Sequence, residues 1–264
     1  MNEKPKIYVL NLNRHKNRLK NIQKQLAKQS LLFERLTAID ARDAREEILG
    51  EFTEKTGPIP RMGAGARACT VGHFKIWKRF LETDANTAFI LEDDVRISND
   101  FAKFIAMAAD CAGQVDILNF NRQDSKRTYK KLVVAKKNNI AKNGFVAKPL
   151  LGPHYGTAGY MITRAAAEFL CCQVKRVNVP IDHLLFNPNV SKFNRSSRIF
   201  QTFPAFVEPD VAQFQTSIQR ETVANSGNFR QKVSRAYYEV NRVPFLAAQL
   251  ISRQSEINIL HFSK

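Results

Sequence analysis

Short apolar runs alternate with longer amphipathic segments through the first half of the chain, and no other feature constrains the fold as strongly. Residues 66–81 and 99–111 carry apolar side chains at helical spacing. The runs around them are short, apolar and rich in β-forming residues, as strands are. These runs cover residues 6–12, 33–39, 87–91 and 115–120. Strands that alternate with helices favour an α/β fold, so we predict a single Rossmann-type domain with a mostly parallel central sheet over residues 1–220.

The second half of the chain has a less regular pattern. Residues 132–134 and 144–147 are β-like and flank Asn138 and Asn139, which predicts a hairpin. A strand, a helix, a short helix and the last core strand are then predicted at residues 156–163, 164–172, 180–186 and 199–203. Residues 221–264 are basic with an apolar stripe and are predicted to form a helical C-terminal extension.

The chain is strongly basic. Its 264 residues include 41 Lys and Arg against 24 Asp and Glu, which gives a formal net charge of +17. An excess of this size implies a polyanionic partner: nucleic acid, an anionic membrane surface or a phosphorylated substrate.

Cysteine spacing and the N-terminal sequence indicate the compartment. No two of the four cysteines form a C-x-x-C pair, which favours buried thiols in a reducing environment. The chain opens into a strand without the apolar segment of a signal peptide. No apolar run reaches the roughly 18 residues of a membrane span. We therefore expect a cytoplasmic protein, or one that is peripheral on the cytoplasmic face of an inner membrane.

Three consecutive carboxylates end the candidate strand at residues 87–91. Glu92, Asp93 and Asp94 repel one another, and a bound cation is the usual compensation. Ligands of open α/β sheets bind beyond the carboxyl ends of the strands. Because alternate residues of an extended segment point the same way, Glu92 and Asp94 could share one Mg²⁺ or Mn²⁺ ion while Asp93 faces elsewhere. The alternative is an acidic strand end that partly caps the helix starting near Ser98.

Several sequence blocks occur in a fixed order. They are Ile7-Tyr-Val-Leu-Asn-Leu-Asn-Arg14 followed by Arg18, Phe33-Glu-Arg-Leu-Thr-Ala-Ile-Asp40, Cys69-Thr-Val-Gly-His73 through Trp77, Leu91-Glu-Asp-Asp-Val95, Gly156-Thr-Ala-Gly-Tyr-Met-Ile162 and Pro180-Ile-Asp182. Together they resemble glycosyltransferase family 25, the lipopolysaccharide or lipooligosaccharide biosynthesis galactosyltransferases, which also include collagen galactosyltransferases. Gly72 and Ala68 depart from the residues that the family commonly has there.

The resemblance implies a GT-A fold, a nucleotide-sugar donor (usually UDP-galactose) and inversion at the anomeric carbon. We therefore predict a metal-dependent transferase that moves a hexose, with galactose and a β-1,4 linkage expected, onto a lipooligosaccharide or lipopolysaccharide acceptor. The divalent cation, Mn²⁺ or Mg²⁺, would be held by Glu92 and Asp94 and would bridge the donor diphosphate.

Asp182 is the candidate general base, because it follows Pro180 and Ile181 at the start of a predicted helix and could take the acceptor proton. Its alternative role is a helix N-cap. Glu208 and Asp210, in the sequence Glu-Pro-Asp, are the competing candidates.

Eight residues are expected to bind the donor. They are Asn11, Arg18, Asp40, His73, Asp93, Gly156, Thr157 and Tyr160. Structural alternatives are a solvated helix face for Arg18, a helix cap for Asp40 and a core position for His73. For residues 156, 157 and 160 the alternative is packing of the strand, whereas a role in the sugar pocket would use the close backbone approach that small residues allow.

Two basic stretches of the chain suggest the surface on which the protein binds its acceptor. Residues 122–148 and the tail beyond residue 220 are basic, and the tail adds the aromatic side chains Tyr237, Tyr238 and Phe245. This combination favours docking on an anionic membrane surface, where a lipid-linked oligosaccharide would be presented. A nucleic-acid-binding protein is the alternative from charge alone, but the chain lacks an RNP, KH or helix-turn-helix signature, so nucleic acid is not expected. A catalytically inactive scaffold with the transferase fold is the third hypothesis, which the changes at Gly72 and Ala68 allow.

Overall fold

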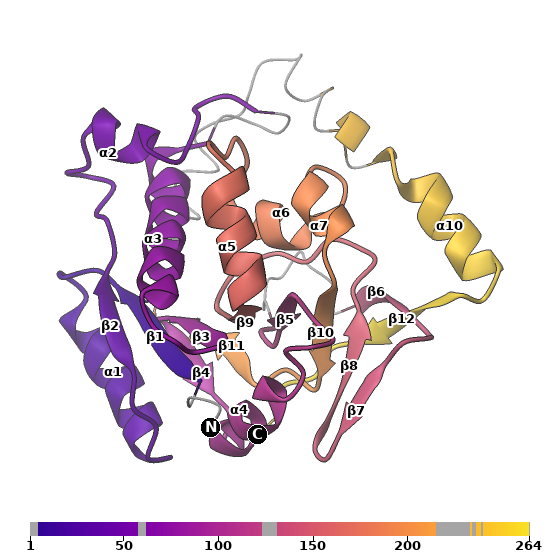
Figure 1. The fold of residues 1–264 in the computed structure, drawn as a ribbon, viewed down its shortest axis with the longest axis horizontal. Coiled ribbons are helices and arrows are strands. Elements are labelled where there is room, and N and C mark those ends of the chain that lie inside the picture. The colour runs from indigo at the N-terminus through magenta and orange to yellow at the C-terminus, as the bar shows by residue number, and fades with distance from the viewer. Residues whose placement is uncertain are drawn as a thin grey trace.

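An eight-stranded sheet forms the centre of the protein, with helices on both faces (Figure 1). The computed structural model describes residues 5–57, 62–122, 131–214, 233, 236–238 and 240–263. Across the sheet the strands are β2 (Glu34–Thr37), β1 (Lys6–Asn11), β3 (Thr87–Glu92), β9 (Gly159–Thr163), β5 (Ile117–Asn119), β10 (Ile199–Phe203), β8 (Phe145–Pro149) and β7 (Ile140–Lys142).

Most of these strands run in the same direction. The pairs β2–β1, β1–β3 and β5–β10 are parallel. Strand β9 is antiparallel to both β3 and β5, and β8 is antiparallel to both β10 and β7. Six of the eight strands therefore point one way and only β9 and β8 oppose them, which confirms the predicted α/β class with a mostly parallel central sheet.

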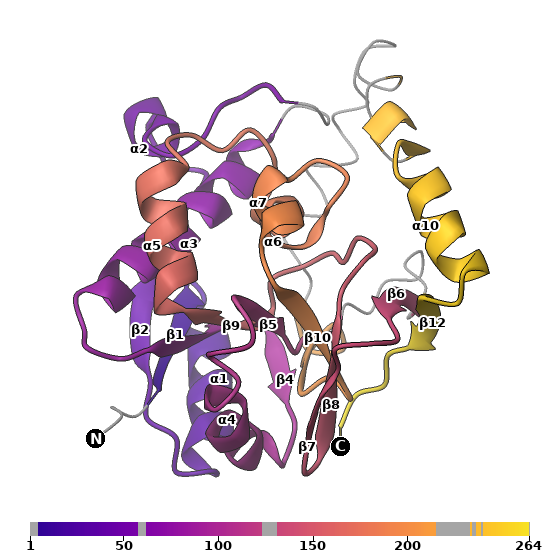
Figure 2. The same cartoon turned by 45° about the vertical axis from the view of Figure 1, so that its right-hand side comes forward.

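The helices form one layer on each face of the sheet (Figure 2). Alternate residues of β1 face opposite layers, so Tyr8 and Leu10 belong to one buried cluster and Ile7 and Val9 to the other. The first cluster packs under α3 (Ala64–Leu81), α5 (Arg164–Gln173), α6 (Ile181–Phe186) and α7 (Lys192–Ser196). The second packs under α1 (Lys16–Ala27) and α4 (Phe101–Ala109). A short helix, α2 (Glu46–Gly50), packs beside α3.

Two further strand pairs flank the main sheet, and one of them corrects the predicted hairpin. Strand β4 (Val95–Ile97) pairs with β11 (Val207–Pro209). Strand β6 (Lys131–Ala135) pairs with β12 (Ser255–Ile259), not with residues 144–147. The hairpin joins β7 and β8 through Asn143 and Gly144, where Gly144 has φ of +102°. Asn-Gly is the stronger turn signal, because glycine readily takes the positive φ that this turn requires at its second central residue.

The C-terminal segment contains a helix and a strand. Helix α10 (Val243–Ile251) lies on the outside of the molecule and has no buried residue. It leads into β12 and then Leu260, which is buried in the first core cluster. Residues 199–203 are the last strand of the central sheet in chain order, as predicted, and β11 and β12 belong to the two smaller sheets. The predicted helical extension is wrong at residues 255–259, which form β12. The boundary at residue 220 stays a prediction, since residues 215–232 lie outside the described part of the chain. Within the described residues, no helix combines the length and apolar character needed to cross a bilayer.

Candidate active site

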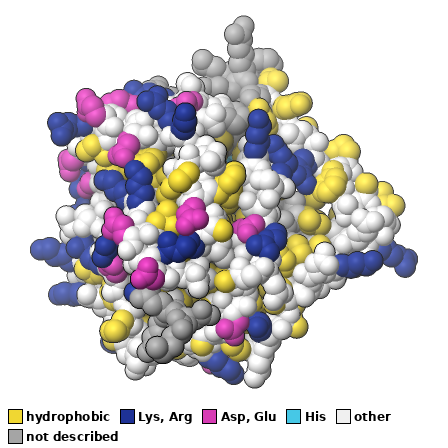
Figure 3. All heavy atoms as spheres, viewed as in Figure 1, with side chains coloured by type: hydrophobic (Ala, Val, Ile, Leu, Met, Phe, Trp, Pro, Cys, Tyr) yellow, Lys and Arg dark blue, Asp and Glu magenta, His cyan; other side chains and the backbone are white. Residues whose placement is uncertain are grey.

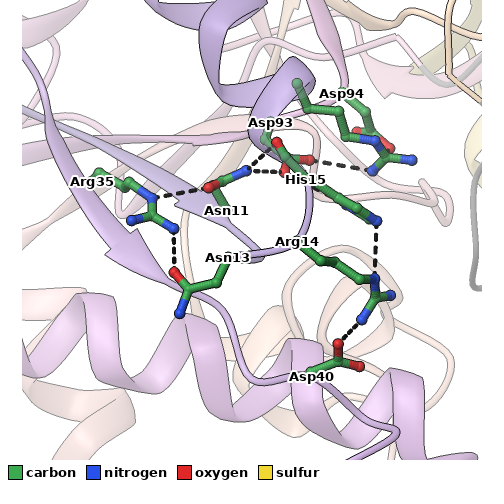
Figure 4. Close-up of polar contacts among 9 residues, drawn as sticks. Asn11, Asn13, Arg14, His15, Arg35, Asp40, Asp93 and Asp94 are labelled. Carbon is green, nitrogen blue, oxygen red and sulfur yellow. Dashed lines mark hydrogen bonds and ion pairs between the residues drawn. The ribbon is translucent and has the colours of Figure 1, made fainter.

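The three consecutive carboxylates lie at the carboxyl end of β3, beside the end of β1. Leu10 pairs with Glu92 in the parallel β1–β3 ladder, so Asn11 comes next to Asp93. The side-chain nitrogen of Asn11 donates to Oδ2 of Asp93 at 2.6 Å (Figure 4). Arg35 Nε donates to the Asn11 side-chain oxygen at 2.9 Å, which holds the amide in this orientation. Two of the predicted donor-binding residues are therefore joined directly.

Helix α1 begins shortly after the end of β1 and brings Arg18 to both aspartates, Asp93 and Asp94. Nη1 of Arg18 lies 3.3 Å from Oδ1 of Asp93 and 3.0 Å from Oδ2 of Asp94. The guanidinium also lies over the ring of Phe214, 5.4 Å from its centroid. Only 13% of the Arg18 side chain is exposed, so Arg18 is not on a solvated helix face. The positive charge of Arg18 partly neutralises the acidic turn, which is the segment Glu92, Asp93 and Asp94.

Glu92 contacts the segment that leads into β9. Thr157 Oγ1 donates to Oε1 of Glu92 at 2.5 Å. Burial raises the pKa of Glu92 to about 8, and the nearby charge of Asp94 adds to the rise. Burial also raises the pKa values of Asp93 and Asp94, although Arg18 opposes both shifts. These three crowded carboxylates, two of them bound to Arg18, form a donor set that a hard divalent cation fits, because its charge would stabilise their ionised forms.

Asp182 faces the same region from α6. Its Oδ2 accepts from the backbone N–H of Gly156 at 3.1 Å, and its Oδ1 accepts from the N–H of His183 at 2.9 Å. The cap of α6 is Pro180, so the N-cap role considered for Asp182 is wrong. The charge of Asp182 acts to raise the pKa values of Glu92, Cys69 and His73, and its bond to Gly156 ties it to the segment that carries Thr157.

The two competing acids, Glu208 and Asp210, lie in and directly after β11. Strand β11 pairs with β4, and Glu208 is held by ion pairs with Arg96 and Arg122. The backbone N–H of Asp210 donates to the backbone oxygen of Asp94 at 2.7 Å. Both acids therefore remain candidates by proximity, although Glu208 is already paired with two guanidinium groups.

His73 and Tyr160 lie beneath the site and are both fully buried. A hydrogen bond of 2.8 Å joins Nδ1 of His73 to the Tyr160 hydroxyl, which also accepts from Trp77 Nε1 at 3.0 Å. Burial lowers the pKa of His73 to about 4, so its imidazole is neutral at pH 7. His73 and Tyr160, which were predicted to bind the nucleotide-sugar donor, therefore lie in the protein interior below Glu92 and Thr157.

Asp40 lies at the edge of the site. Its carboxylate is ion-paired with Arg14 (Figure 4) and also with Arg42. It caps no helix of the described residues, because α2 starts at Glu46 after Arg45. Beside it, a hollow of about 390 Å³ opens at the start of α1. The hollow is lined by Arg14, His15, Lys16, Asn17, Arg18, Gln213 and Phe214.

A comparison with known protein families shows which family the chain belongs to. The model described as "Glycosyltransferase family 25 (LPS biosynthesis protein)" matches residues 4–185. The chain belongs to glycosyltransferase family 25. The resemblance drawn from the sequence blocks is therefore confirmed, and membership in a glycosyltransferase family implies a sugar donor and an oligosaccharide acceptor.

Individual relatives of this family 25 protein come from bacteria and animals. It is 27% identical over 191 residues to "Lipooligosaccharide biosynthesis protein lic2B" of Haemophilus influenzae, covering 68% of this chain and 69% of that protein. It is 25% identical over 165 residues to "Lacto-N-neotetraose biosynthesis glycosyltransferase LgtB" of Neisseria meningitidis serogroup B, covering 61% and 59%. A "Glycosyltransferase 25 family member" of Aedes aegypti is 26% identical over 204 residues, which are 71% of this chain but 32% of the mosquito protein. The chain thus spans about a third of the length of its insect relative.

Sequence reasoning missed part of the site of this family 25 member. Arg14 and His15 were not assigned a role, yet Arg14 binds Asp40 and His15 Nδ1 lies 3.9 Å from Oδ2 of Asp93. Their position between the end of β1 and the start of α1 was the available signal, because that turn borders the carboxyl end of the sheet. Cys69 was also missed, although it precedes His73 by one helical turn.

Proposed function

We propose that this protein transfers a hexose, galactose from UDP-galactose in the first instance, onto a lipooligosaccharide or lipopolysaccharide acceptor, with inversion and a β-1,4 linkage. Family membership and the names of the Haemophilus and Neisseria relatives support this substrate class. The observation that carries the proposal is the crowding of Glu92, Asp93 and Asp94 at the end of β3, with Arg18 bound to the two aspartates beside a basic hollow.

Each group in the site has a role in such a transfer. A Mn²⁺ or Mg²⁺ ion held by Glu92 and Asp94 would neutralise the diphosphate as it leaves. Arg14 and Lys16, which line the hollow, supply positive charge for phosphate oxygens. Asp182 accepts the proton of the acceptor hydroxyl, and the N–H groups of Gly156 and His183 fix its orientation. Gly156 has φ of +83°, a conformation that favours glycine and leaves room for the sugar.

UDP release from UDP-galactose tests the reaction, measured with Mn²⁺ and with a chelator. We expect release only with the metal, and Asp94→Ala should abolish it. Asp100→Ala is the matched control, because Asp100 is an exposed acid six residues away. Release that is unchanged in Asp94→Ala would refute the metal-binding role. No release from any nucleotide sugar would favour the scaffold or nucleic-acid alternatives.

Parallel assays with UDP-glucose and UDP-N-acetylglucosamine, followed by NMR of the product, identify donor and linkage.

Separate substitution of the three candidate bases, Asp182, Glu208 and Asp210, identifies which of them takes the acceptor proton. Asp182→Asn should lower the transfer rate by about 10²–10⁴-fold while donor binding is retained, because a base acts on the proton and not on the nucleotide. Glu208→Gln and Asp210→Asn should retain most of the activity. A larger loss in either of them than in Asp182→Asn would reassign the base.

We further propose that the protein attaches to an anionic membrane surface through α10. Val243, Phe245 and Ile251 are exposed by 53%, 45% and 83%. The Arg242 guanidinium lies 4.6 Å from the centroid of the Phe245 ring, and exposed Arg253 follows the helix. On this side of the molecule, hydrophobic side chains lie next to Lys and Arg side chains (Figure 3). Apolar and basic groups on one helix favour the interface of an anionic bilayer.

Co-sedimentation with vesicles tests the attachment. The protein should bind anionic vesicles better than neutral ones, and Ile251→Asp should weaken this binding. Leu32→Asp is the control, because Leu32 is 91% exposed but lies between α1 and β2, on the opposite side of Figure 1 from α10. Equal binding of both variants, or none by the unaltered protein, would contradict the proposal. The predicted basic residues at 123–130 and 215–232 lie outside the described residues.

A further inference from the structure

Cys69, His73 and Glu92 bring sulfur, nitrogen and oxygen ligands together below the acidic turn. One ligand atom from each residue lies within 4.8 Å of the other two. Cys69 and His73 are four residues apart on α3 and so share one face of the helix, which is directed at the end of β3. The proposed transfer reaction makes no use of the Cys69 thiol. We propose that these three side chains form a binding site for a zinc ion, distinct from the hard-cation site but sharing Glu92 with it.

The unused nitrogen of His73 is an independent indication of a ligand. His73 is fully buried, and its Nδ1 is bonded to the Tyr160 hydroxyl. Its Nε2 is buried and has no hydrogen-bond partner among the described residues. An unpaired buried polar atom is costly and calls for an explanation. When Nδ1 carries the proton and donates to Tyr160, Nε2 presents its lone pair as a metal ligand does.

The surrounding groups are arranged as the outer contacts of a metal site usually are. Tyr160 fixes the orientation of the His73 ring, and Trp77 in turn donates to Tyr160. Thr157 holds one oxygen of Glu92 at 2.5 Å. These contacts restrict the imidazole and the carboxylate before any ion arrives.

The ligand set selects zinc over magnesium or manganese. Thiolate and imidazole are softer ligands than carboxylate, and three protein ligands with one open position are a common zinc arrangement. Zinc bonds of about 2.0–2.3 Å would require the three ligand atoms to close in by roughly 1 Å. Burial raises the pKa of the Cys69 thiol well above its ordinary value, so the ion must displace that proton, as zinc does when it binds cysteine.

Shared use of Glu92 has a consequence for the transferase. An ion on Cys69, His73 and Glu92 withdraws that carboxylate from the site at Asp94, so zinc should inhibit sugar transfer. This consequence rests on the proposed function, whereas zinc binding itself does not.

Cobalt substitution tests the site without any sugar substrate. The full chain, purified with reduced thiols, is titrated with Co²⁺, and the sulfur-to-cobalt absorption reports a thiolate ligand. We expect one such ion per chain, displaced by Zn²⁺. Cys69→Ser should remove the absorption and weaken Zn²⁺ binding by more than about 100-fold, since loss of even an outer contact costs 10–100-fold. Glu92→Gln, a nearly isosteric change, should weaken it as well.

Matched cysteine variants control for other thiols. Cys171 and Cys172 are adjacent and at least partly exposed, so the double change to serine tests adventitious binding. The absorption should persist in that variant. Its absence in the unaltered protein, or its persistence in Cys69→Ser, would overturn the proposal.

Activity assays then separate this proposal from the proposed function. Zinc should inhibit UDP release by the unaltered protein and inhibit Cys69→Ser at least tenfold less effectively. If no variant releases UDP but the cobalt absorption depends on Cys69, the transferase hypothesis fails and the zinc site stands.

Discussion

The Tyr160 hydroxyl is the central polar contact of the buried layer below the carboxylates. It accepts from Trp77 and is bonded to His73, and all three side chains are fully buried. We predict that Tyr160→Phe lowers the free energy of unfolding by about 1–3 kcal/mol, because it leaves buried polar partners unpaired without changing the size of the ring much. Urea unfolding measures the change. A loss below about 0.5 kcal/mol would show that water or a rearranged histidine replaces the hydroxyl.

His154 should make stability depend on pH. It is 4% exposed, and burial lowers its pKa to about 4 from the ordinary value of 6.5. Between these values the unfolded chain binds a proton that the folded chain does not, so the stability from neutral His154 is present above pH 6.5 and is lost as the pH falls toward 4. The full effect is at most about 3 kcal/mol.

His154→Gln isolates this contribution. The unfolding free energy of the unaltered protein should fall more steeply than that of the variant between about pH 7 and about pH 4.5. Glu92 has the opposite dependence, because its raised pKa of about 8 removes stability as the pH rises from 4.5, but it is present in both proteins and cancels in the difference. Parallel curves for the two proteins would contradict the predicted shift.

At the residue scale, the sequence predicted the acids and several neighbouring site residues, but not which of them touch. Glu92, Asp93 and Asp94 could be identified because an apolar strand that ends in three carboxylates is unusual. The contact between Asn11 and Asp93 joins residues 82 positions apart and depends on β1 lying beside β3. Strand order of this kind is a tertiary property, so the contact of Arg35 with Asn11 could not be predicted from local pattern alone.

At the element scale, strand β9 shows how the sheet positions the site. It lies antiparallel between β3 and β5, where Gly159 pairs with Leu91. A Cβ at Gly159 would lie 2.6 Å from a ring carbon of Phe120 and 3.1 Å from Cβ of Val207. The glycine therefore lets three elements approach closely at the end of the strand that carries Glu92.

We predict that Gly159→Ala destabilises the fold by about 1–3 kcal/mol through overpacking, and that transfer activity falls with it as β3 shifts. Gly113→Ala is the matched control, because a Cβ there meets no atom within 4 Å and should change stability by less than about 0.5 kcal/mol. Thermal unfolding of both variants measures the difference. Equal melting temperatures would mean that Phe120 moves aside at little cost.

The pairing of β6 with β12 illustrates which elements were predictable. The β-type of β6 was predicted, and helix α3 was predicted to within two residues at its start. Strand β12 was not predicted, because residues 221–264 were expected to be helical. The partner of β6 lies about 120 residues further along the chain, and period and propensity carry no information about so distant a partner. Element type was therefore accessible in the periodic first half of the chain, whereas the partner of each strand was not.

At the scale of the whole molecule, the C-terminal segment is tied to the transferase core. Leu260 is 2% exposed and belongs to the buried cluster that contains Trp77. Ala205 donates its N–H to the backbone oxygen of His261 at 2.8 Å, next to this contact. The outer helix α10 thus stands between two attached segments, residues up to 214 and residues 255–263.

We predict that Leu260→Ala lowers the free energy of unfolding of the entire protein by about 2–5 kcal/mol, as loss of a buried leucine does elsewhere. Ile259→Ala is the control, because Ile259 is the neighbouring residue but is 52% exposed. Chemical unfolding followed by Trp77 fluorescence reports the core, since Trp77 is the one tryptophan of the chain. If residues 221–264 folded as a separate unit, Leu260→Ala would leave the Trp77 transition unchanged. A shifted, still cooperative transition would instead show that the C-terminal segment and the candidate site share one core.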